Sequence, residues 1–182
     1  MESIKSVRDI DGDQRVAVNV SPRQLGSGST FDQVVWALDE YGVDSNRLEL
    51  EITESVPLSG DSPAVVELLK LKSLGVKIAL DDFGTGFASL SYLQNFPFDS
   101  LKIDRSFVTS PSDDALSLAI VRSVTSLANE LMIETTAEGI ETHEQLARVQ
   151  SMGCTYAQGF YLGRPSSIDI THKPATILRP VA

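Results

Sequence analysis

The stretch LELEIT at residues 48–53 indicates the fold class of this chain, because its apolar and polar side chains alternate with a period of two. In an extended strand the leucine and isoleucine side chains share one face, and the glutamate and threonine side chains share the other. Strands of a doubly wound sheet are apolar on both faces, since helices cover both. An alternating strand fits better in a barrel, whose inner face becomes polar at the carboxyl ends of its strands.

Similar runs recur on both sides of this stretch and are separated by runs with helical periodicity. Six strands are expected, at residues 15–20, 48–53, 76–81, 101–105, 132–137 and 155–161. Amphipathic helices are expected between them, at residues 31–41, 63–74, 87–94, 114–131 and 142–152. Three glycines follow helical runs, where a left-handed cap favours this residue: Gly42, Gly75 and Gly153. Strands and helices that alternate with short links predict parallel βα units.

The length of the chain is short for a complete barrel of this kind. A whole (β/α)₈ barrel takes about 250 residues, and this chain has 182. The sequence therefore predicts an α/β fold of the barrel type with six strands, short of a complete (β/α)₈ TIM-type barrel.

The composition excludes several classes of protein. Lys and Arg number 15 against 25 Asp and Glu, a formal net charge of −10, whereas binding to a nucleic-acid polymer needs clustered positive charge. Apolar runs stay well below the roughly 20 residues of a membrane span, and the N-terminus lacks the apolar core of a signal peptide. Cys154 is the only cysteine, which fits a reducing compartment. We therefore expect a cytoplasmic protein without direct membrane insertion, and expect Cys154 and Trp36 in its core.

Polar side chains stand near the carboxyl ends of all the predicted strands. They are Asn19, Glu51, Asp81, Asp82, Lys102, Glu138 and Gln158. Parallel strands bring their carboxyl ends to one edge, so these groups are expected to converge. Carboxylate and amide oxygens are the ligands that Mg²⁺ and Mn²⁺ prefer, and no cluster of His and Cys points to zinc. Adjacent aspartates are suited to a two-metal site for displacement at phosphorus. Bound cations would also reconcile an acidic chain with an anionic substrate.

Each of these residues also has an ordinary structural interpretation. Asp82 and Asn19 could cap a helix or stand in a turn. Lys102 could be a solvated or salt-bridged lysine, and Glu51 could be an exposed strand residue. These interpretations weaken jointly, because capping alone does not explain suitable groups at six separate strand ends.

Two short motifs imitate known sites and are set aside. The loop that begins Gly84-Thr85-Gly86 follows a strand, but it lacks the third glycine of a dinucleotide fingerprint, and the two preceding aspartates would repel a pyrophosphate. The triplet Asp82-Phe83-Gly84 matches the metal-binding triplet of kinases, but the chain has no HRD catalytic motif.

Six blocks resemble, in order, the signature blocks of EAL domains, which are modified (β/α)₈ barrels that hydrolyse cyclic di-GMP. The blocks are VNVSPRQL (18–25), LELEITES (48–55), KIALDDFGTGFASLSYL (77–93), LKIDRSFV (101–108), AEGIET (137–142) and QGFYLGRP (158–165). The resemblance covers residues 15–166 and implies an EAL-type phosphodiesterase that takes cyclic di-GMP to linear pGpG.

The resemblance also implies a role for each matching residue. Asn19, Glu51 and Asp81 would hold one Mg²⁺ or Mn²⁺, and Asp81, Asp82 and Glu138 would hold the second. Lys102 would orient the attacking water and help to deprotonate it, with Glu138 as a further catalytic residue. Gln158 would hydrogen-bond the water or a phosphate oxygen, and Asp104 would contact the substrate. Glu54 would anchor the loop from Asp82 to Tyr92, which would form a dimer contact. Glu141 would support the site by contacting residues that hold the metal, without binding the metal itself.

The chain also departs from the family pattern. The Glu-Ala-Leu block, whose glutamate is a metal ligand, and the first strand of the family are absent from these 182 residues. We expect residues 1–170 to form a partial EAL domain that lacks two strands, with residues 171–182 as a tail. A fragment of a longer protein and a natural truncation both fit this pattern.

This departure shapes the expectations for function and assembly. Without the glutamate, turnover by the isolated chain is expected to be weak or absent. The alternative is a catalytically inactive receptor for cyclic di-GMP or a protein-interaction module. Open edges at strands 15–20 and 155–161 predict a homodimer or a strand-exchanged oligomer.

Overall fold

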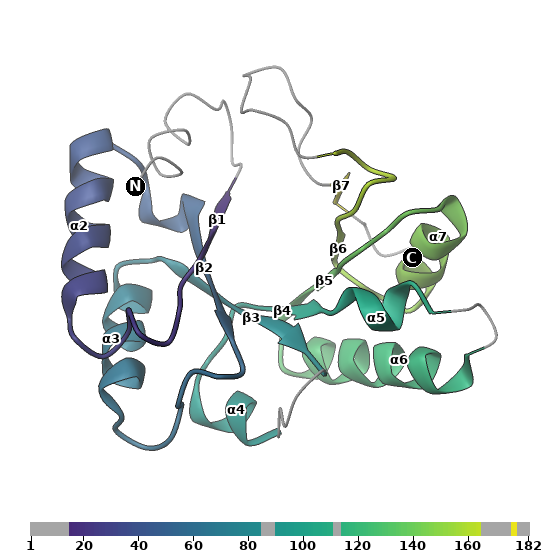
Figure 1. Ribbon diagram of the computed structural model, residues 1–182, viewed down its shortest axis with the longest axis horizontal. Helices are drawn as coiled ribbons and strands as arrows, with labels where there is room; N and C mark the ends of the chain where they lie inside the picture. The colour runs from purple at the N-terminus through teal and green to yellow at the C-terminus, as the bar shows by residue number, and fades with distance from the viewer. Residues whose placement is uncertain (1–14, 85–89, 111–113, 165–175, 178–182) are drawn as a thin grey trace. The chain divides into compact units, whose positions relative to one another are not determined.

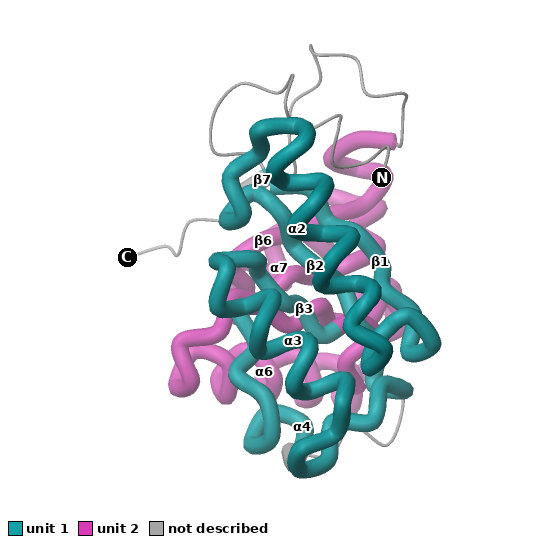
Figure 2. Tube along the Cα trace, turned by 90° about the vertical axis from the view of Figure 1, so that its left-hand side faces the viewer, with its two compact units in different colours: residues 1–80, 88–99 teal, residues 81–87, 100–182 magenta. Residues whose placement is uncertain are grey.

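The computed structural model describes residues 15–84, 90–110, 114–164 and 176–177 (Figure 1). The chain divides into two compact units, coloured separately in Figure 2. The first unit comprises residues 1–80 and 88–99, and the second comprises residues 81–87 and 100–182. Strand β3 (Lys77–Phe83) belongs to the first unit up to Leu80 and to the second from Asp81 onward.

The first unit consists of βα repeats. In chain order its elements are β1 (Val16–Asn19), α2 (Ser29–Tyr41), the 3₁₀ helix η1 (Ser45–Arg47), β2 (Leu48–Thr53), α3 (Pro63–Ser73), the start of β3 and α4 (Leu90–Asn95). Strands β1 and β2 are parallel, and Asn19 at the end of β1 is the register partner of Glu51. The two strands therefore end level with each other.

The second unit continues the alternation. After the end of β3 its elements are β4 (Ser100–Ile103), α5 (Arg105–Val108), α6 (Ala115–Glu130), β5 (Glu134–Ala137), α7 (His143–Ser151), β6 (Tyr156–Ala157) and β7 (Thr176–Ile177). Strand β5 pairs in parallel with β4 and with β6. Among the described residues, no helix is long and apolar enough to cross a membrane.

The order of predicted strands and helices is confirmed. Strand β2 spans the residues expected of it, and the cap positions Gly42, Gly75 and Gly153 all have a positive φ. Part of the predicted helix 87–94 lies outside the described residues. Helix α5 was not expected. It is one turn long and begins after Asp104, whose carboxylate accepts a hydrogen bond from the Ser106 N–H at 3.0 Å.

The end of the sheet at β6 differs from the prediction in two ways. Strand β6 has only two residues, because the chain turns after Ala157 and the amides of Leu162 and Gly163 bond the carbonyl of Gly159. The expected open edge at this strand is wrong, since β6 pairs in antiparallel fashion with β7. Two residues from the stretch expected as a loose tail supply the missing hydrogen-bonding partners.

The alternation in β2 predicts its apolar face correctly and its polar face only in part. Leu48, Leu50 and Ile52 are at most 1% exposed. Glu51 is also buried, at 7% exposed, so its interpretation as an exposed strand residue is wrong. The polar face of β2 is therefore buried at the position of Glu51.

The two expected core residues outside the strands behave differently. Cys154 is buried as expected, and burial raises the pKa of its thiol to about 12. Trp36 was expected in the core and this is wrong, because it is 52% exposed and packs edge-on against Tyr41. Helix α2 buries a stripe at helical spacing, Thr30, Val34 and Ala37, and Trp36 lies off it.

Helix α2 begins without a side chain of its own to cap it, since its N-cap is Gly28. Glu67 of helix α3, which is 3% exposed, takes this role. Its carboxylate accepts hydrogen bonds from the amides of Gly26 at 2.6 Å, Gly28 at 3.2 Å and Phe31 at 3.0 Å. Because helix amino termini attract negative charge, this one residue joins α3 to the start of α2.

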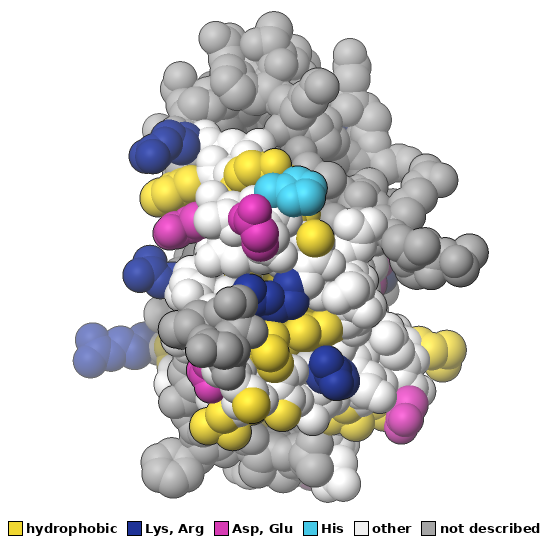
Figure 3. Space-filling view, turned by 90° about the vertical axis from the view of Figure 1, so that its right-hand side faces the viewer, with side chains coloured by type: hydrophobic (Ala, Val, Ile, Leu, Met, Phe, Trp, Pro, Cys, Tyr) yellow, Lys and Arg dark blue, Asp and Glu magenta, His cyan; other side chains and the backbone are white. Residues whose placement is uncertain are grey.

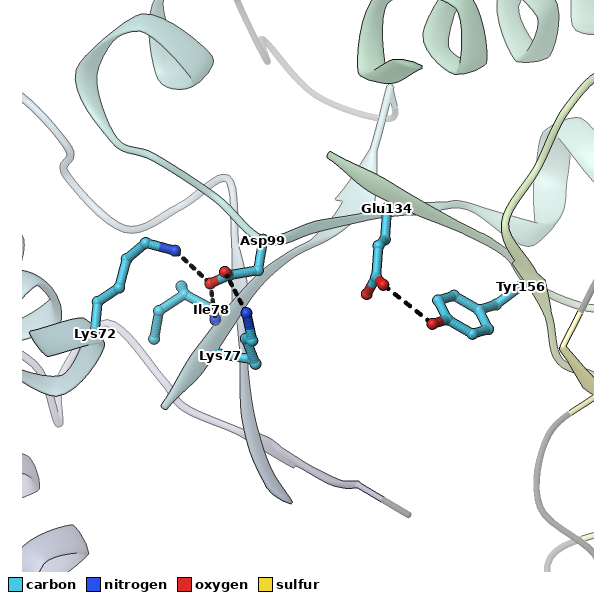
Figure 4. Close-up of polar contacts among 6 residues, drawn as sticks. All are labelled: Lys72, Lys77, Ile78, Asp99, Glu134 and Tyr156. Atoms are coloured by element: carbon cyan, nitrogen blue, oxygen red, sulfur yellow. Dashed lines mark hydrogen bonds and ion pairs between the residues drawn. The ribbon is translucent and has the colours of Figure 1, made fainter. Parts of the chain in front are cut away.

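A second carboxylate organises the amino end of β3 within the first unit (Figure 4). Asp99 contacts the Lys72 ammonium at 2.5 Å and the Lys77 ammonium at 3.1 Å, and it accepts a bond from the Ile78 amide at 3.0 Å. Burial acts to raise the pKa of Asp99, but these bonds outweigh it and hold the pKa below its usual value. The carboxylate is therefore kept ionised.

Candidate active site

The end of strand β3 carries two consecutive carboxylates that do not point to opposite faces. Asp82 has a φ of 56°, in the left-handed region, and its amide donates to Asp81 Oδ1 at 3.1 Å. Side chains of successive residues alternate in a regular strand, and a left-handed residue breaks that alternation. Asp is one of the few side chains that tolerates this conformation. The backbone at this point brings both carboxylates toward one site.

Strand β4 places a buried lysine between two acidic side chains. The Lys102 Nζ lies 3.1 Å from Asp81 Oδ1 and 2.7 Å from Glu138 Oε1. Lys102 is 6% exposed, so it is not the solvated lysine of the alternative interpretation, although it is salt-bridged. A buried charge is tolerated when it is paired and hydrogen-bonded, and both conditions hold here.

The ends of β5 and β6 bring in the remaining groups. The Glu138 amide bonds the Ile103 carbonyl at 3.1 Å, and the Gln158 amide bonds the Ala137 carbonyl at 2.9 Å. These bonds extend the parallel ladders by one residue past each strand. The Gln158 side-chain amide then donates to Glu138 Oε1 at 2.6 Å. Glu138 is therefore fixed from both neighbouring strands.

Three carboxylates in this unit have the arrangement of a cation site. One ligand oxygen from each of Asp81, Asp82 and Glu138 lies within 4.8 Å of the others. The pKa of Asp82 is raised by burial and by the negative charges of Asp81 and Asp104, against a smaller opposing effect of Lys102. Hard oxygen ligands crowded against like charge suit a divalent cation, which would relieve the repulsion. The donor set therefore fits a divalent cation.

Asp104 has a clear local role in addition to any contact with substrate. It caps helix α5 through the Ser106 amide. Burial acts to raise the pKa of Asp104, but its hydrogen bonds with Ser106 and Arg105 outweigh burial and lower it. Asp104 is therefore held as an anion close enough to Asp82 to raise the pKa of Asp82. Its predicted role in substrate binding stays a prediction.

The other predicted ligands lie in the first unit. Asn19 and Glu51 are register partners at the ends of β1 and β2, which puts them on the same face of the paired strands. The Tyr92 hydroxyl donates to the carbonyls of Glu54 and, at 3.0 Å, Val56. Helix α4 therefore contacts the main chain at Glu54. The middle of the loop predicted to be anchored by Glu54, residues 85–89, lies outside the described residues.

Glu141 is exposed and lies just before helix α7, whose N-cap is Thr142. Its amide donates to Gln145 Oε1 at 2.7 Å, next to a capping box formed by Thr142 and Gln145. The structure gives Glu141 this local contact, and its predicted support of the site stays a prediction.

The sequence assigned no role to two residues that follow Gln158. Phe160 is 54% exposed, and the guanidinium carbon of Arg164 lies 4.8 Å from the centre of its ring. The signal that could have found them is an aromatic residue and an arginine four positions apart, directly after a predicted site glutamine.

This chain is similar to known proteins over most of its length. Residues 1–165 match the family model described as EAL domain. The protein NbdA of Pseudomonas aeruginosa, described as a cyclic di-GMP phosphodiesterase, is 38% identical over 151 residues, which are 83% of this chain and 19% of that protein. The chain spans about a fifth of the length of the curated relatives it matches.

Solved structures share the fold. The MucR phosphodiesterase of Pseudomonas aeruginosa, in complex with c-di-GMP, is 38% identical with a TM-score of 0.83, covering 90% of this chain and 73% of that one. The Klebsiella pneumoniae protein BlrP1, in complex with manganese and c-di-GMP, is 30% identical with a TM-score of 0.82, covering 90% of this chain and 42% of that one. The predicted α/β fold, an incomplete (β/α)₈ barrel with six parallel strands, is confirmed.

Proposed function

Because this chain belongs to the EAL domain family, we propose that it hydrolyses one phosphodiester bond of cyclic di-GMP to give linear pGpG. The observation that carries the proposal is the buried Lys102, held between Asp81 and Glu138 with Asp82 close by. A buried lysine among carboxylates at the ends of parallel strands is expected of a reaction centre in this fold.

We propose that divalent cations, Mg²⁺ or Mn²⁺, bind here. Asp81, Asp82 and Glu138 would hold them, and we assign Asn19 and Glu51 the same role because their motifs match the family. When bound, such cations offset the charge of the phosphate and lower the pKa of water. The close approach of the three carboxylates within the second unit supports the assignment.

Several side chains of the site would position the attacking water and the phosphate. Lys102 would orient the attacking water by donating a hydrogen bond to it, and only the neutral amine of Lys102 could accept the proton of that water. Gln158 holds Glu138 in place through its side-chain amide and would also bond the water or a phosphate oxygen. The water oxygen forms a new bond to phosphorus, the bond to the ribose 3′ oxygen breaks, and that oxygen leaves with the proton that the water loses.

The test is direct measurement of pGpG. The purified chain is incubated with cyclic di-GMP and Mn²⁺, and the product is separated by chromatography. Any turnover is expected to disappear in Asp81→Asn and Lys102→Met and to persist in Asp61→Asn, which changes an exposed acid. Product formed equally by all four proteins would contradict the proposed site. Binding of the dinucleotide without turnover would favour the receptor alternative.

Two further proposals concern context. We propose a cytoplasmic location and association into a homodimer or a strand-exchanged oligomer. The remaining support for association is the position of β1 at one end of the sheet. Light scattering at high protein concentration tests the association, and a monodisperse monomer would contradict it.

A further inference from the structure

An aromatic ring and a guanidinium group lie together just beyond the catalytic glutamine. Phe160 comes two residues after Gln158, a span of at most about 7 Å of chain, and the Gln158 side chain reaches Glu138. More than half of Phe160 is exposed, and the guanidinium carbon of Arg164 lies over one face of its ring, which leaves the other face for a ligand. Figure 3 shows one face of the molecule, on which hydrophobic and acidic side chains lie next to a histidine.

The segment that carries Phe160 is held rigidly. The Ile140 amide donates to the Gln158 carbonyl at 3.0 Å, and the Tyr161 amide donates to the Ile140 carbonyl at 2.9 Å. Gly159 between them packs so closely that a Cβ would come within 2.2 Å of the Ile140 backbone. The chain then closes a turn from Gly159 to Gly163. Phe160 is therefore presented in a fixed position, which lowers the entropy lost when a ligand binds.

We infer that Phe160 and Arg164 form a stacking surface for one guanine base of cyclic di-GMP, an inference that rests on the proposed function. Flat bases stack on aromatic rings and on guanidinium planes, and a cation near the ring strengthens such a platform. A base stacked on Phe160 is joined by its sugar to a phosphate, which is then within reach of Gln158. Arg164 also supplies positive charge for the dianionic ligand in a chain of net charge −10.

Calorimetric titration of the full chain with cyclic di-GMP in the presence of Ca²⁺ tests this inference. Phe160→Ala is expected to weaken binding about tenfold, the typical effect of losing one stacked base, and Phe160→Trp is expected to restore it. Arg164→Lys keeps the charge but loses the planar group, so weaker binding is expected there too. The control is Leu131→Ala, which removes another exposed side chain (46% exposed) near the opposite end of β5.

The outcomes separate this inference from the proposed function. Binding that is unchanged in Phe160→Ala, with the unmodified chain binding normally, would overturn the stacking surface and leave the proposed function standing. Absence of binding by the unmodified chain would overturn both. The inference is supported if Phe160→Ala has the same melting temperature as the unmodified chain but binds more weakly, and if Phe160→Trp binds as the unmodified chain does. A purely structural effect of Phe160→Ala would instead lower the melting temperature.

Discussion

Lys102 and Glu138 face each other across the carboxyl ends of β4 and β5, with the ammonium 2.7 Å from the carboxylate. The same ammonium lies 3.1 Å from Asp81. One positive charge thus separates two negative ones in a largely buried space. Both the stability of this region and its proposed chemistry depend on that single lysine.

Replacing Lys102 with methionine keeps most of the side-chain length and removes the charge. The two carboxylates are then left facing each other, so the free energy of unfolding without metal is expected to fall by about 3–5 kcal/mol. Turnover is expected to fall by at least about 100-fold, because the group that orients water is lost. Urea unfolding and product chromatography measure the two effects. A variant with the original stability would show that Asp81 and Glu138 do not need this partner.

Manganese is expected to stabilise the chain. A ligand that binds only the folded state at 100 times its dissociation constant adds about 2.7 kcal/mol to the free energy of unfolding. Melting temperature is measured with Mn²⁺ and after chelation. Asp82→Asn should reduce the shift, because it removes one of the three clustered carboxylates, and the exposed Asp61→Asn should keep it. Equal shifts in both variants would place the ion elsewhere.

Acid is expected to release the stabilisation that Asp99 provides. Its pKa is lower in the folded state than its ordinary value near 3.8, so the unfolded chain binds protons first as the pH falls. The contribution is complete above that ordinary value and is lost as the pH falls through the lowered one. At pH 7, Asp99→Asn should be less stable by roughly 1–2 kcal/mol. This difference should shrink toward pH 3 in urea unfolding, and a constant difference would refute the linkage.

Removing the Glu67 carboxylate is expected to weaken the start of helix α2. Glu67→Ala leaves three amides without the acceptor they now share, at a cost of about 2–4 kcal/mol in the free energy of unfolding. Glu67→Gln keeps one acceptor oxygen and should lose less. Hydrogen exchange of the Phe31 amide reports the local effect. Protection that survives in Glu67→Ala would mean that another group caps the helix.

Two glycines of the same turn offer a matched pair. A Cβ at Gly159 would collide with the Ile140 backbone, whereas a Cβ at Gly163 would meet nothing within 4 Å. Gly159→Ala should therefore lower the melting temperature and weaken binding of cyclic di-GMP, and Gly163→Ala should change neither. Similar behaviour of the two variants would show that the approach of Gly159 to Ile140 is not important.

The order of elements could be read from the sequence because periodicity and glycine caps are local signals. Strand β2 was predicted to the residue for this reason. Strand β7 could not be found, since its two residues carry no pattern and their pairing with β6 is a long-range event. Trp36 was misplaced because size and hydrophobicity favour burial, while its angular position on helix α2 decides exposure.

The candidate site was predictable as a set of residues but not as a geometry. Residues at strand ends are expected to meet, and Asp81, Lys102, Glu138 and Gln158 do so within the second unit. The burial of Lys102 between two acids depends on packing that no single strand specifies. The Phe160 and Arg164 contact was missed because it forms in a turn after β6, which ends at Ala157, whereas a strand as far as residue 161 was predicted.

The left-handed backbone of Asp82 has a use beyond this chain. A regular strand can offer only every second residue to one face, so a sheet normally needs two strands to supply two adjacent ligands. One left-handed residue here lets consecutive positions serve the same cation site. A designer who wants a compact metal centre on a sheet could therefore place Asp-Asp at a strand end with the second residue left-handed. The second ligand then does not need a neighbouring strand to supply it.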